Sequence, residues 1–131
     1  MSVNDPIADY LCRVRNAISA KHEKVDIPAS RVKVEITKIL KEEGFIQNYK
    51  VQDDTKQGSI RIFFRYVDGS PVITGLKQVS KPGRRIYVNK TKVPRVIGGL
   101  GVSIVSTSRG IMTGEQSHKQ GVGGEILCEI W

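Results

Sequence analysis

The spacing of apolar residues in the first third of the chain predicts two amphipathic helices. Asp5-Pro6 supplies a helix N-cap followed by a proline suited to the first helical position. Pro28 and Ser30 introduce the second helix, and Gly44 is expected to end it. The apolar stripes are Ile7, Leu11, Val14 and Ile18 in the first helix and Val32, Ile36, Ile39 and Leu40 in the second.

Strands are predicted where this helical spacing gives way to alternation of apolar and polar residues. A short extended piece is expected at residues 25–27, and two strands are expected at residues 45–51 and 60–66. In the second strand, one predicted face carries Ile60, Ile62, Phe64 and Tyr66, and the other carries Arg61, Phe63 and Arg65. The hydrophilic residues 52–58 are expected to form the hairpin turn between the two strands. With the helices, these strands make an N-terminal α-β-α-β-β lobe of residues 1–68.

The remainder, residues 69–131, is richer in glycine and predicts a mainly β lobe. Its predicted strands are residues 72–79, 85–89, 101–106 and 124–130, and its predicted turn is Lys81-Pro82-Gly83. Residues 112–120 lack strong apolar periodicity and are expected to form a loop or one helical turn. The fold class is therefore predicted as α+β, with two small lobes.

Positive charge is concentrated in the second lobe. The 131-residue chain has a net charge of +8, and residues 69–114 contain no Asp or Glu. The cations in this window are Lys77, Lys81, Arg84, Arg85, Lys90, Lys92, Arg95 and Arg109. Such a field suits nucleic acid, an anionic membrane surface or an acidic protein. Nucleic acid is favoured, because the cations are spread over predicted strands and turns and not along one amphipathic helix.

The cysteines and the apolar runs indicate a soluble protein without a metal centre. Cys12 and Cys128 lie far apart and lack the spacing of a zinc site, so reduced and mostly buried thiols are expected, with a single disulfide as the alternative. No apolar run reaches the length of a signal peptide or a membrane span, so no membrane partner is expected.

Catalytic and cofactor motifs are absent from the sequence. The glycines at 98–101 and 121–124 lack the spacing of phosphate or dinucleotide loops, so no cofactor is expected. His22 and His118 are isolated, and no enzyme is expected. A small hydrolase or nucleotide-binding enzyme remains as an alternative, which would require a pocket with a base beside Ser108.

A cluster of hydroxyls follows the predicted strand at residues 101–106. Clustered hydroxyls can form hydrogen bonds with the 2′-hydroxyls and base edges of RNA, and an arginine can contact a phosphate. The alternative is a turn whose hydroxyls bond to their own backbone. The candidate residues are Ser106, Thr107, Ser108 and Arg109, followed by Gly110.

A second candidate lies in the segment SKPGRRIYVN. On a strand, Arg85, Tyr87 and Asn89 share one face, where an aromatic ring can stack on a base while its neighbours bond to the RNA backbone. Lys81 and Arg84 add charge beside them. The alternative is a surface strand whose tyrosine covers a lobe interface.

Two further groups complete the candidates. Glu125 lies on the last strand and is expected to organise a nearby arginine or lysine, to accept from a base amine, or to face away. Arg13, Arg15 and Asn16 of the first helix either contact phosphates or form a solvated flank. A general DNA-binding protein remains a further alternative.

Five segments carry a resemblance to a known family. They are DPIADYLCRVRNA, KILKEEGFI, VSKPGRRIY, GGLGVSIVSTSRGIMT and GVGGEILC. Over nearly its full length the chain is similar to the family of the eighth protein of the bacterial small ribosomal subunit. The chain departs from the family pattern at residues 114–119, where the family is acidic and then rich in arginine and alanine, and at Arg84, where relatives are often apolar.

The resemblance implies a primary 16S ribosomal RNA-binding protein that recognises a helix of the central domain, helps to assemble the platform and, in many bacteria, represses translation of its own operon messenger. Proteins five and twelve of the small subunit are the implied neighbours, with a monomer before assembly. A cytoplasmic ribosome is implied, with a plastid ribosome as the alternative. By matching position, RNA-contacting roles fall on Ser106, Thr107, Ser108 and Tyr87, with Glu125 and Cys128 on the adjacent strand and Asp5, Arg13, Arg15 and Asn16 on a helix that also approaches RNA.

Overall fold

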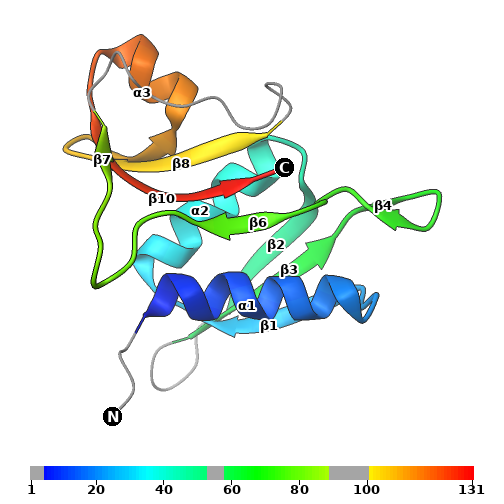
Figure 1. Cartoon of the computed structure of the whole chain (residues 1–131). Helices are drawn as coiled ribbons and strands as arrows, with labels where there is room; N and C mark the ends of the chain where they lie inside the picture. The colour runs from blue at the N-terminus through cyan, green and yellow to red at the C-terminus, as the bar shows by residue number, and fades with distance from the viewer. Residues whose placement is uncertain (1–4, 53–57, 89–100) are drawn as a thin grey trace. The chain divides into compact units, whose positions relative to one another are not determined.

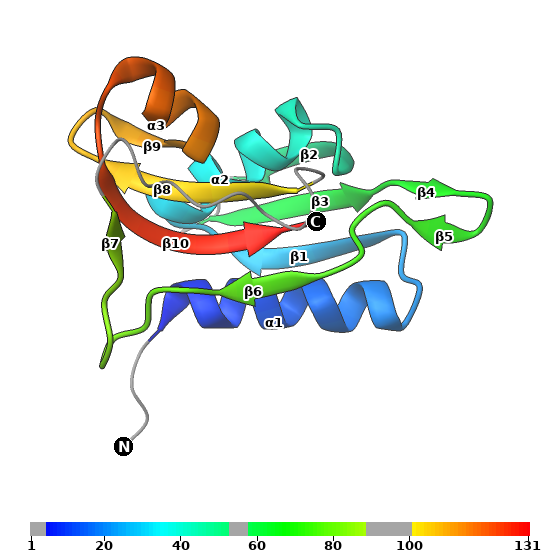
Figure 2. The ribbon, with the colours of Figure 1, turned by 45° about the horizontal axis from the view of Figure 1, so that its top comes forward.

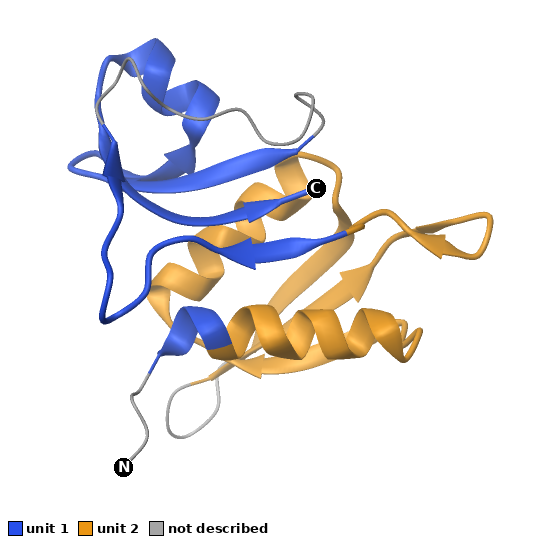
Figure 3. Ribbon diagram, in the orientation of Figure 1, with its two compact units in different colours: residues 1–8, 75–131 blue, residues 9–74 orange. Residues whose placement is uncertain are grey.

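The computed structural model describes residues 5–52, 58–88 and 101–131. The chain divides into one unit of residues 9–74 and another of residues 1–8 and 75–131, and each is described by itself (Figure 3). The fold is α+β, as predicted from the sequence. The division falls between Thr74 and Gly75, whereas the sequence analysis placed the lobe boundary between residues 68 and 69; that boundary stays a prediction.

The unit of residues 9–74 follows the predicted order of helices and strands (Figure 1). Its three-stranded antiparallel sheet has the order β1-β3-β2, and β4 and β5 form a separate hairpin. The elements are α1 (Pro6–Ser19), β1 (Lys24–Pro28), α2 (Arg31–Glu42), β2 (Ile46–Gln52), β3 (Ser59–Phe64), β4 (Tyr66–Val67) and β5 (Ser70–Pro71). The predicted turn at 52–58 lies mostly outside the described residues.

Both helices begin at the predicted caps. Ala8 N donates to Asp5 Oδ1 at 3.1 Å, and Lys33 N donates to Ser30 Oγ at 3.2 Å. Gly44 follows α2 with a φ of 81°, a left-handed conformation that costs glycine little. These caps satisfy backbone groups that a helix cannot pair internally, which explains why local sequence predicts the helix ends well.

The buried stripe of α2 differs from the prediction at one position. Val32 is 37% exposed, whereas Lys33 and Thr37 are buried with Ile36, Ile39 and Leu40. Lys33 Nζ donates to Pro28 O at 3.2 Å, and Thr37 Oγ1 and Tyr10 Oη lie 2.7 Å apart. These hydrogen bonds allow two polar residues to occupy the buried face that apolar spacing assigned to Val32.

The sheet of this unit packs on one face. Ile60, Ile62 and Phe64 of β3 are buried, while Arg61 and Phe63 between them are half-buried. The Tyr10–Thr37 hydrogen bond joins α1 to α2, and both helices lie in front of the sheet in Figure 1. Within the described residues of this unit, no helix therefore lies on the opposite face.

The unit of residues 1–8 and 75–131 is built around β10, which is central to a second sheet. The order is β6-β10-β8-β9, and β7 pairs with the end of β10 beyond β6. The elements are β6 (Leu76–Gln78), β7 (Tyr87–Val88), β8 (Val102–Thr107), β9 (Gly110–Thr113), α3 (Gly114–Gln120) and β10 (Gly124–Ile130). The predicted strands at 72–79 and 85–89 are thus much shorter than expected, although Asn89 lies outside the described residues.

Residues 112–120 are more regular than the expected loop or one helical turn. Met112 and Thr113 end β9, and α3 follows. Thr113 and Gln116 form a reciprocal capping box, with Gln116 N donating to Thr113 Oγ1 at 3.1 Å and Thr113 N donating to Gln116 Oε1 at 3.0 Å. Gly121 ends the helix with a φ of 69°. Capping, and not apolar periodicity, thus forms this helix.

Both cysteines are free thiols; Cys128 is buried as expected, whereas Cys12 is exposed, because it lies on the face of α1 opposite the buried Leu11 and Val14. Among the described residues, no helix is long and apolar enough to cross a membrane. Within the same residues, no group of three or more His, Cys, Asp or Glu is arranged to hold a metal ion.

Candidate nucleic-acid interface

The register of three strands brings together residues that are far apart in sequence. Glu125 of β10 lies opposite Tyr87 of β7 on one side and opposite Ser106 of β8 on the other. Residues directly opposite in an antiparallel ladder project from the same face. Tyr87, Glu125 and Ser106 therefore form one row, named here the hydroxyl row, and the tyrosine in it is 68% exposed.

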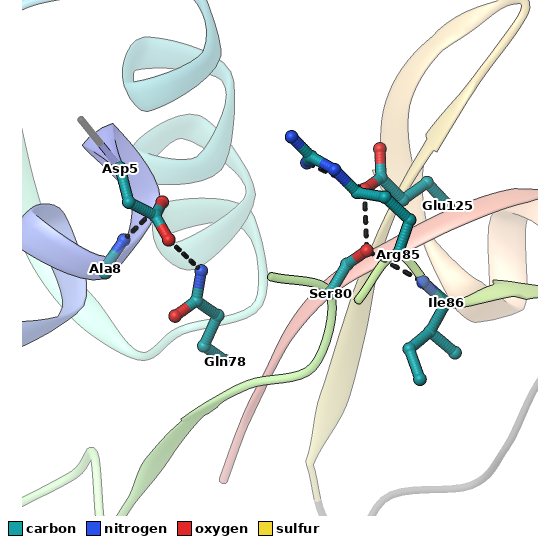
Figure 4. Close-up of polar contacts among 7 residues, drawn as sticks. All are labelled: Asp5, Ala8, Gln78, Ser80, Arg85, Ile86 and Glu125. Atoms are coloured by element: carbon teal, nitrogen blue, oxygen red, sulfur yellow. Dashed lines mark hydrogen bonds and ion pairs between the residues drawn. The ribbon is translucent and has the colours of Figure 1, made fainter. Parts of the chain in front are cut away.

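A buried serine holds the acid of this row. Ser80 Oγ donates to Glu125 Oε2 at 2.6 Å and accepts from Ile86 N at 2.9 Å (Figure 4). Arg85 donates to the same carboxylate oxygen at 3.1 Å from its terminal guanidinium nitrogen. Of the three roles considered for Glu125, the structure shows the organisation of an arginine, with the carboxylate paired to Arg85 within the row.

A tight turn presents two further cations near β7. Lys81 and Arg84 form an isolated β-bridge, with backbone hydrogen bonds of 3.0 Å and 2.9 Å in the two directions. Pro82 and Gly83 form the tip, as the sequence predicts. Both cations are exposed, and neither makes a salt bridge within the described part of the chain. Their charge is therefore available to an anionic ligand.

The hydroxyl cluster is the end of a hairpin and not a free loop. Ser106 and Thr107 end β8, Ser108 and Arg109 form a two-residue turn, and Gly110 begins β9 with a φ of 110°. Thr107 Oγ1 accepts from Arg109 N at 3.0 Å and donates to Gly110 O at 2.8 Å.

The two readings of the cluster therefore apply to different residues. Thr107 uses its hydroxyl to close its own turn, which is the alternative that the sequence left open. The hydroxyls of Ser106 and Ser108 make no hydrogen bond within the described residues. Those two serines can thus donate to and accept from a ligand, and Arg109 is exposed beside them.

Gly124 allows β8 and β10 to approach closely at this point. A Cβ atom on Gly124 would lie 2.1 Å from Ser106 O, in the backbone of the neighbouring strand. Only glycine therefore fits at this position without a shift of one strand. The close approach places the backbone of Ser106 directly against β10, where Ser106 pairs with Glu125.

The candidates on the first helix belong to the unit of residues 9–74. Arg13 Nε donates to Asp9 Oδ2 at 2.9 Å, and Asn16 Nδ2 donates to Cys12 Sγ at 3.5 Å. Arg15 is exposed on the same helix. The positive charge of Arg13 is thus partly compensated by an acid one turn earlier, which weakens its case as a phosphate contact.

Sequence reasoning missed Ser80 as a member of the site. Its side chain is almost fully buried, at 3% exposure, although it begins a segment of hydrophilic and basic residues. A serine just before a Lys-Pro-Gly turn is a signal for a hydroxyl that bonds to nearby backbone, and Ser80 does accept from Ile86 N. Its bond to Glu125 depends on strand pairing and had no local signal.

The described residues do not assemble the hydrolase alternative. The hydroxyls of Ser106 and Ser108 have no hydrogen bond to a histidine or carboxylate there, and Ser80 binds a carboxylate that also holds an arginine. The burial of Cys128 raises the pKa of its thiol to about 12, so this group is not a thiolate nucleophile at neutral pH.

Comparison with known proteins gives matches over nearly the whole chain. The family model described as Ribosomal protein S8 matches residues 5–131. The small ribosomal subunit protein uS8 of Thermodesulfovibrio yellowstonii is 58% identical over 130 residues, covering 98% of this chain and 99% of that protein. The uS8 of Desulforudis audaxviator is 57% identical with the same coverage. The uS8 of Caldicellulosiruptor bescii is 58% identical over an alignment of 132 residues, which covers 100% of this chain and 100% of that protein.

Proposed function

Since the chain belongs to the ribosomal protein S8 family and is a structural, non-enzymatic constituent of the small ribosomal subunit, we propose that it binds 16S ribosomal RNA through the hydroxyl row. The observation that carries the proposal is the register of Tyr87, Glu125 and Ser106, which gathers a largely exposed aromatic ring and an available hydroxyl on one face. Ribosomal location follows from the family; the RNA contacts are the proposal.

The chemistry of the row suits structured RNA. An exposed tyrosine can stack on a base or sugar, and the hydroxyls of Ser106 and Ser108 can pair with 2′-hydroxyls or base edges. Lys81, Arg84 and Arg109 supply charge for phosphates. Because Arg85 already pairs with Glu125, the carboxylate repels phosphate less than a free acid would.

A set of variants separates contact from folding. Ser106→Ala and Ser108→Ala each remove a hydroxyl that the hairpin does not use, so RNA affinity should fall about fivefold each while stability is retained. Tyr87→Ala should weaken binding about fivefold or more, and Tyr87→Phe should retain the stacking. Thr107→Ala should instead weaken the turn, and Thr107→Ser should restore it.

Binding is measured by fluorescence anisotropy with a fragment of the 16S central domain, at several salt concentrations. Lys81→Gln and Arg84→Gln should each lower the salt slope by about 0.7–0.9 if they contact phosphate. Lys38→Gln, an exposed cation on α2, is the matched control. Unchanged affinity in a well-folded Ser106→Ala, Ser108→Ala double variant would remove the hairpin from the RNA contact.

Competition at physiological salt tests the finer parts of the proposal. We expect the central-domain helix to compete far better than unrelated structured RNA or duplex DNA. Equal affinity for DNA would instead favour a general DNA-binding protein. The leader of the protein's own operon messenger belongs in the same competition, because repression would require that it present a similar RNA shape to the same surface.

The setting of the protein follows the same proposal. We expect a monomer before assembly, and proteins five and twelve of the small subunit as neighbours afterwards. The relatives named above are bacterial, which supports a cytoplasmic ribosome over a plastid one. Crosslinking within assembled subunits would test the two neighbours.

A further inference from the structure

The face of the β1-β3-β2 sheet opposite the helices carries two in-register rows, named here the open face. One row is Lys24, Phe63 and Asn48, and the next is Asp26, Arg61 and Lys50. Phe63 and Arg61 lie on the central strand β3, so each has a neighbour on both sides. The order of the three strands is β1-β3-β2, and Figure 2 shows β1 and β3 side by side.

Burial shows that this face is not packed like its opposite. Along β3, Ile60, Ile62 and Phe64 are buried, whereas Arg61 and Phe63 are half-buried. The flanking side chains of Lys24, Asn48 and Lys50 are exposed. An aromatic ring at the centre of a sheet face with polar, exposed neighbours is partly accessible to a ligand.

The charges of the open face favour an anion. Arg61 donates to both carboxylate oxygens of Asp26, at 2.8 Å and 3.1 Å, so that acid is neutralised within the face. Lys50 Nζ lies 5.9 Å from the centre of the Phe63 ring. Neither Lys24 nor Lys50 makes a salt bridge within the described residues. Two cations therefore flank one aromatic ring.

We propose that the open face binds an unpaired, single-stranded segment of RNA. A base stacks on Phe63, while the ammonium groups of Lys24 and Lys50, on strands at opposite edges of the sheet, contact the phosphates on either side. Stacking on an aromatic ring between cations is how single strands are bound without base-specific hydrogen bonds. This surface belongs to the unit of residues 9–74 and uses none of the residues of the hydroxyl row.

The choice of RNA over an acidic protein rests on the aromatic ring. An acidic partner would need only the cations, whereas a base would also stack on the partly exposed ring of Phe63. Phe63→Leu keeps an apolar side chain but removes the π face, and Phe63→Tyr keeps that face. Oligouridine, which has little secondary structure, is the probe, and a polyglutamate peptide is the competitor.

Binding of oligouridine to the full chain is measured by anisotropy and by amide chemical shifts. We expect shifts at Lys24, Asn48, Lys50 and Phe63. Affinity should fall about fivefold or more in Phe63→Leu and in Lys50→Gln, and be retained in Phe63→Tyr and in the control Lys38→Gln. Circular dichroism checks that each variant is folded.

Two outcomes would overturn the proposal. Equal affinity of Phe63→Leu and the unmodified chain for oligouridine would rule out stacking on Phe63. If polyglutamate displaces the labelled oligouridine as effectively as unlabelled oligouridine does, the open face binds an acidic protein instead. The same titration in a Tyr87→Ala background separates the two surfaces. If Tyr87→Ala abolishes oligouridine binding and Phe63→Leu has no effect, oligouridine binds the hydroxyl row and not the open face. The proposal that the hydroxyl row binds 16S RNA fails in a different way: Tyr87→Ala would then bind the central-domain fragment with unchanged affinity.

Discussion

Ser80 and Glu125, 45 positions apart in sequence, share a hydrogen bond of 2.6 Å between Oγ and Oε2. The same hydroxyl accepts from Ile86 N, one residue before the exposed Tyr87. Because Glu125 also accepts from Arg85, the serine links the turn at residues 81–84, the start of β7 and the centre of the sheet.

Ser80→Ala should therefore destabilise the fold and weaken RNA binding together. The substitution leaves Ile86 N without its acceptor and removes one donor from Glu125, which costs about 1–3 kcal/mol of unfolding free energy. Chemical denaturation measures the loss. Ser70→Ala, at an exposed position, is the control and should change stability by less than about 0.5 kcal/mol. Full stability in Ser80→Ala would show that water replaces the hydroxyl.

Gly124→Ala should destabilise the sheet by about 1–3 kcal/mol, because its Cβ would lie 2.1 Å from Ser106 O and one strand must move. Gly83→Ala is the matched control, since nothing lies within 4 Å of a Cβ placed there. Thermal unfolding compares the two. RNA affinity of Gly124→Ala should also fall, because the shift moves Ser106; an effect no larger than that of Gly83→Ala contradicts the close approach.

Gly75→Ala should loosen the pairing of Gly75 with Trp131. The two residues exchange backbone hydrogen bonds of 3.0 Å and 3.1 Å, and a Cβ on Gly75 would lie 2.5 Å from the indole ring. We expect a shift in tryptophan fluorescence and a lower melting temperature. In a Trp131→Ala background, Gly75→Ala should lower the melting temperature less than it does in the unmodified chain, because the clash with the indole ring is absent. An equal decrease in both backgrounds would mean that the ring moves aside freely.

The two cysteines should differ in reactivity towards a thiol reagent. Burial raises the pKa of Cys128 to about 12, whereas Cys12 is exposed on α1. In the native protein only Cys12 should react rapidly at pH 8, and Cys12→Ser should remove this fast phase. Both thiols should react after denaturation. Rapid reaction of two thiols in the native state would show that β10 opens readily.

The raised pKa of Cys128 also predicts a loss of stability at alkaline pH. A thiol that ionises less readily when folded contributes stability that is fully present below its unfolded pKa of about 8.5. The contribution is lost as the pH rises from there towards about 12. Cys128→Ala should flatten this part of the stability profile, while Cys12→Ala should leave it unchanged.

Asp26→Asn should lower stability at neutral pH but not in acid. The hydrogen bonds from Arg61 hold the pKa of Asp26 below its ordinary value. A lowered carboxyl pKa gives stability above the unfolded pKa, about 3.9, that is lost as the pH falls through the lower folded value. Denaturation of wild type and variant between pH 2 and pH 7 tests this, with Glu42→Gln as an exposed control. A difference that persists at the acid end would point to a cause other than ionisation.

Local sequence determined the elements whose signals are local. The caps at Asp5 and Ser30 start the helices as predicted, because a cap satisfies backbone groups within a few residues. The alternation of Ile60 and Ile62 with Arg61 identified both faces of β3 for the same reason, since strand neighbours point to opposite sides. The sequence also located the hydroxyl cluster and the Lys81-Pro82-Gly83 turn, and the family resemblance that the comparisons confirm.

Tertiary structure decided which of these residues meet. Tyr87, Ser106 and Glu125 share a row only because of the register of three strands, and Ser80 joins them through a hydrogen bond with no local signal. Backbone hydrogen bonds between distant segments set that register, and one residue of slip would turn every side chain to the other face. Sequence alone thus located the groups proposed to contact RNA, and strand pairing decided which of them lie together.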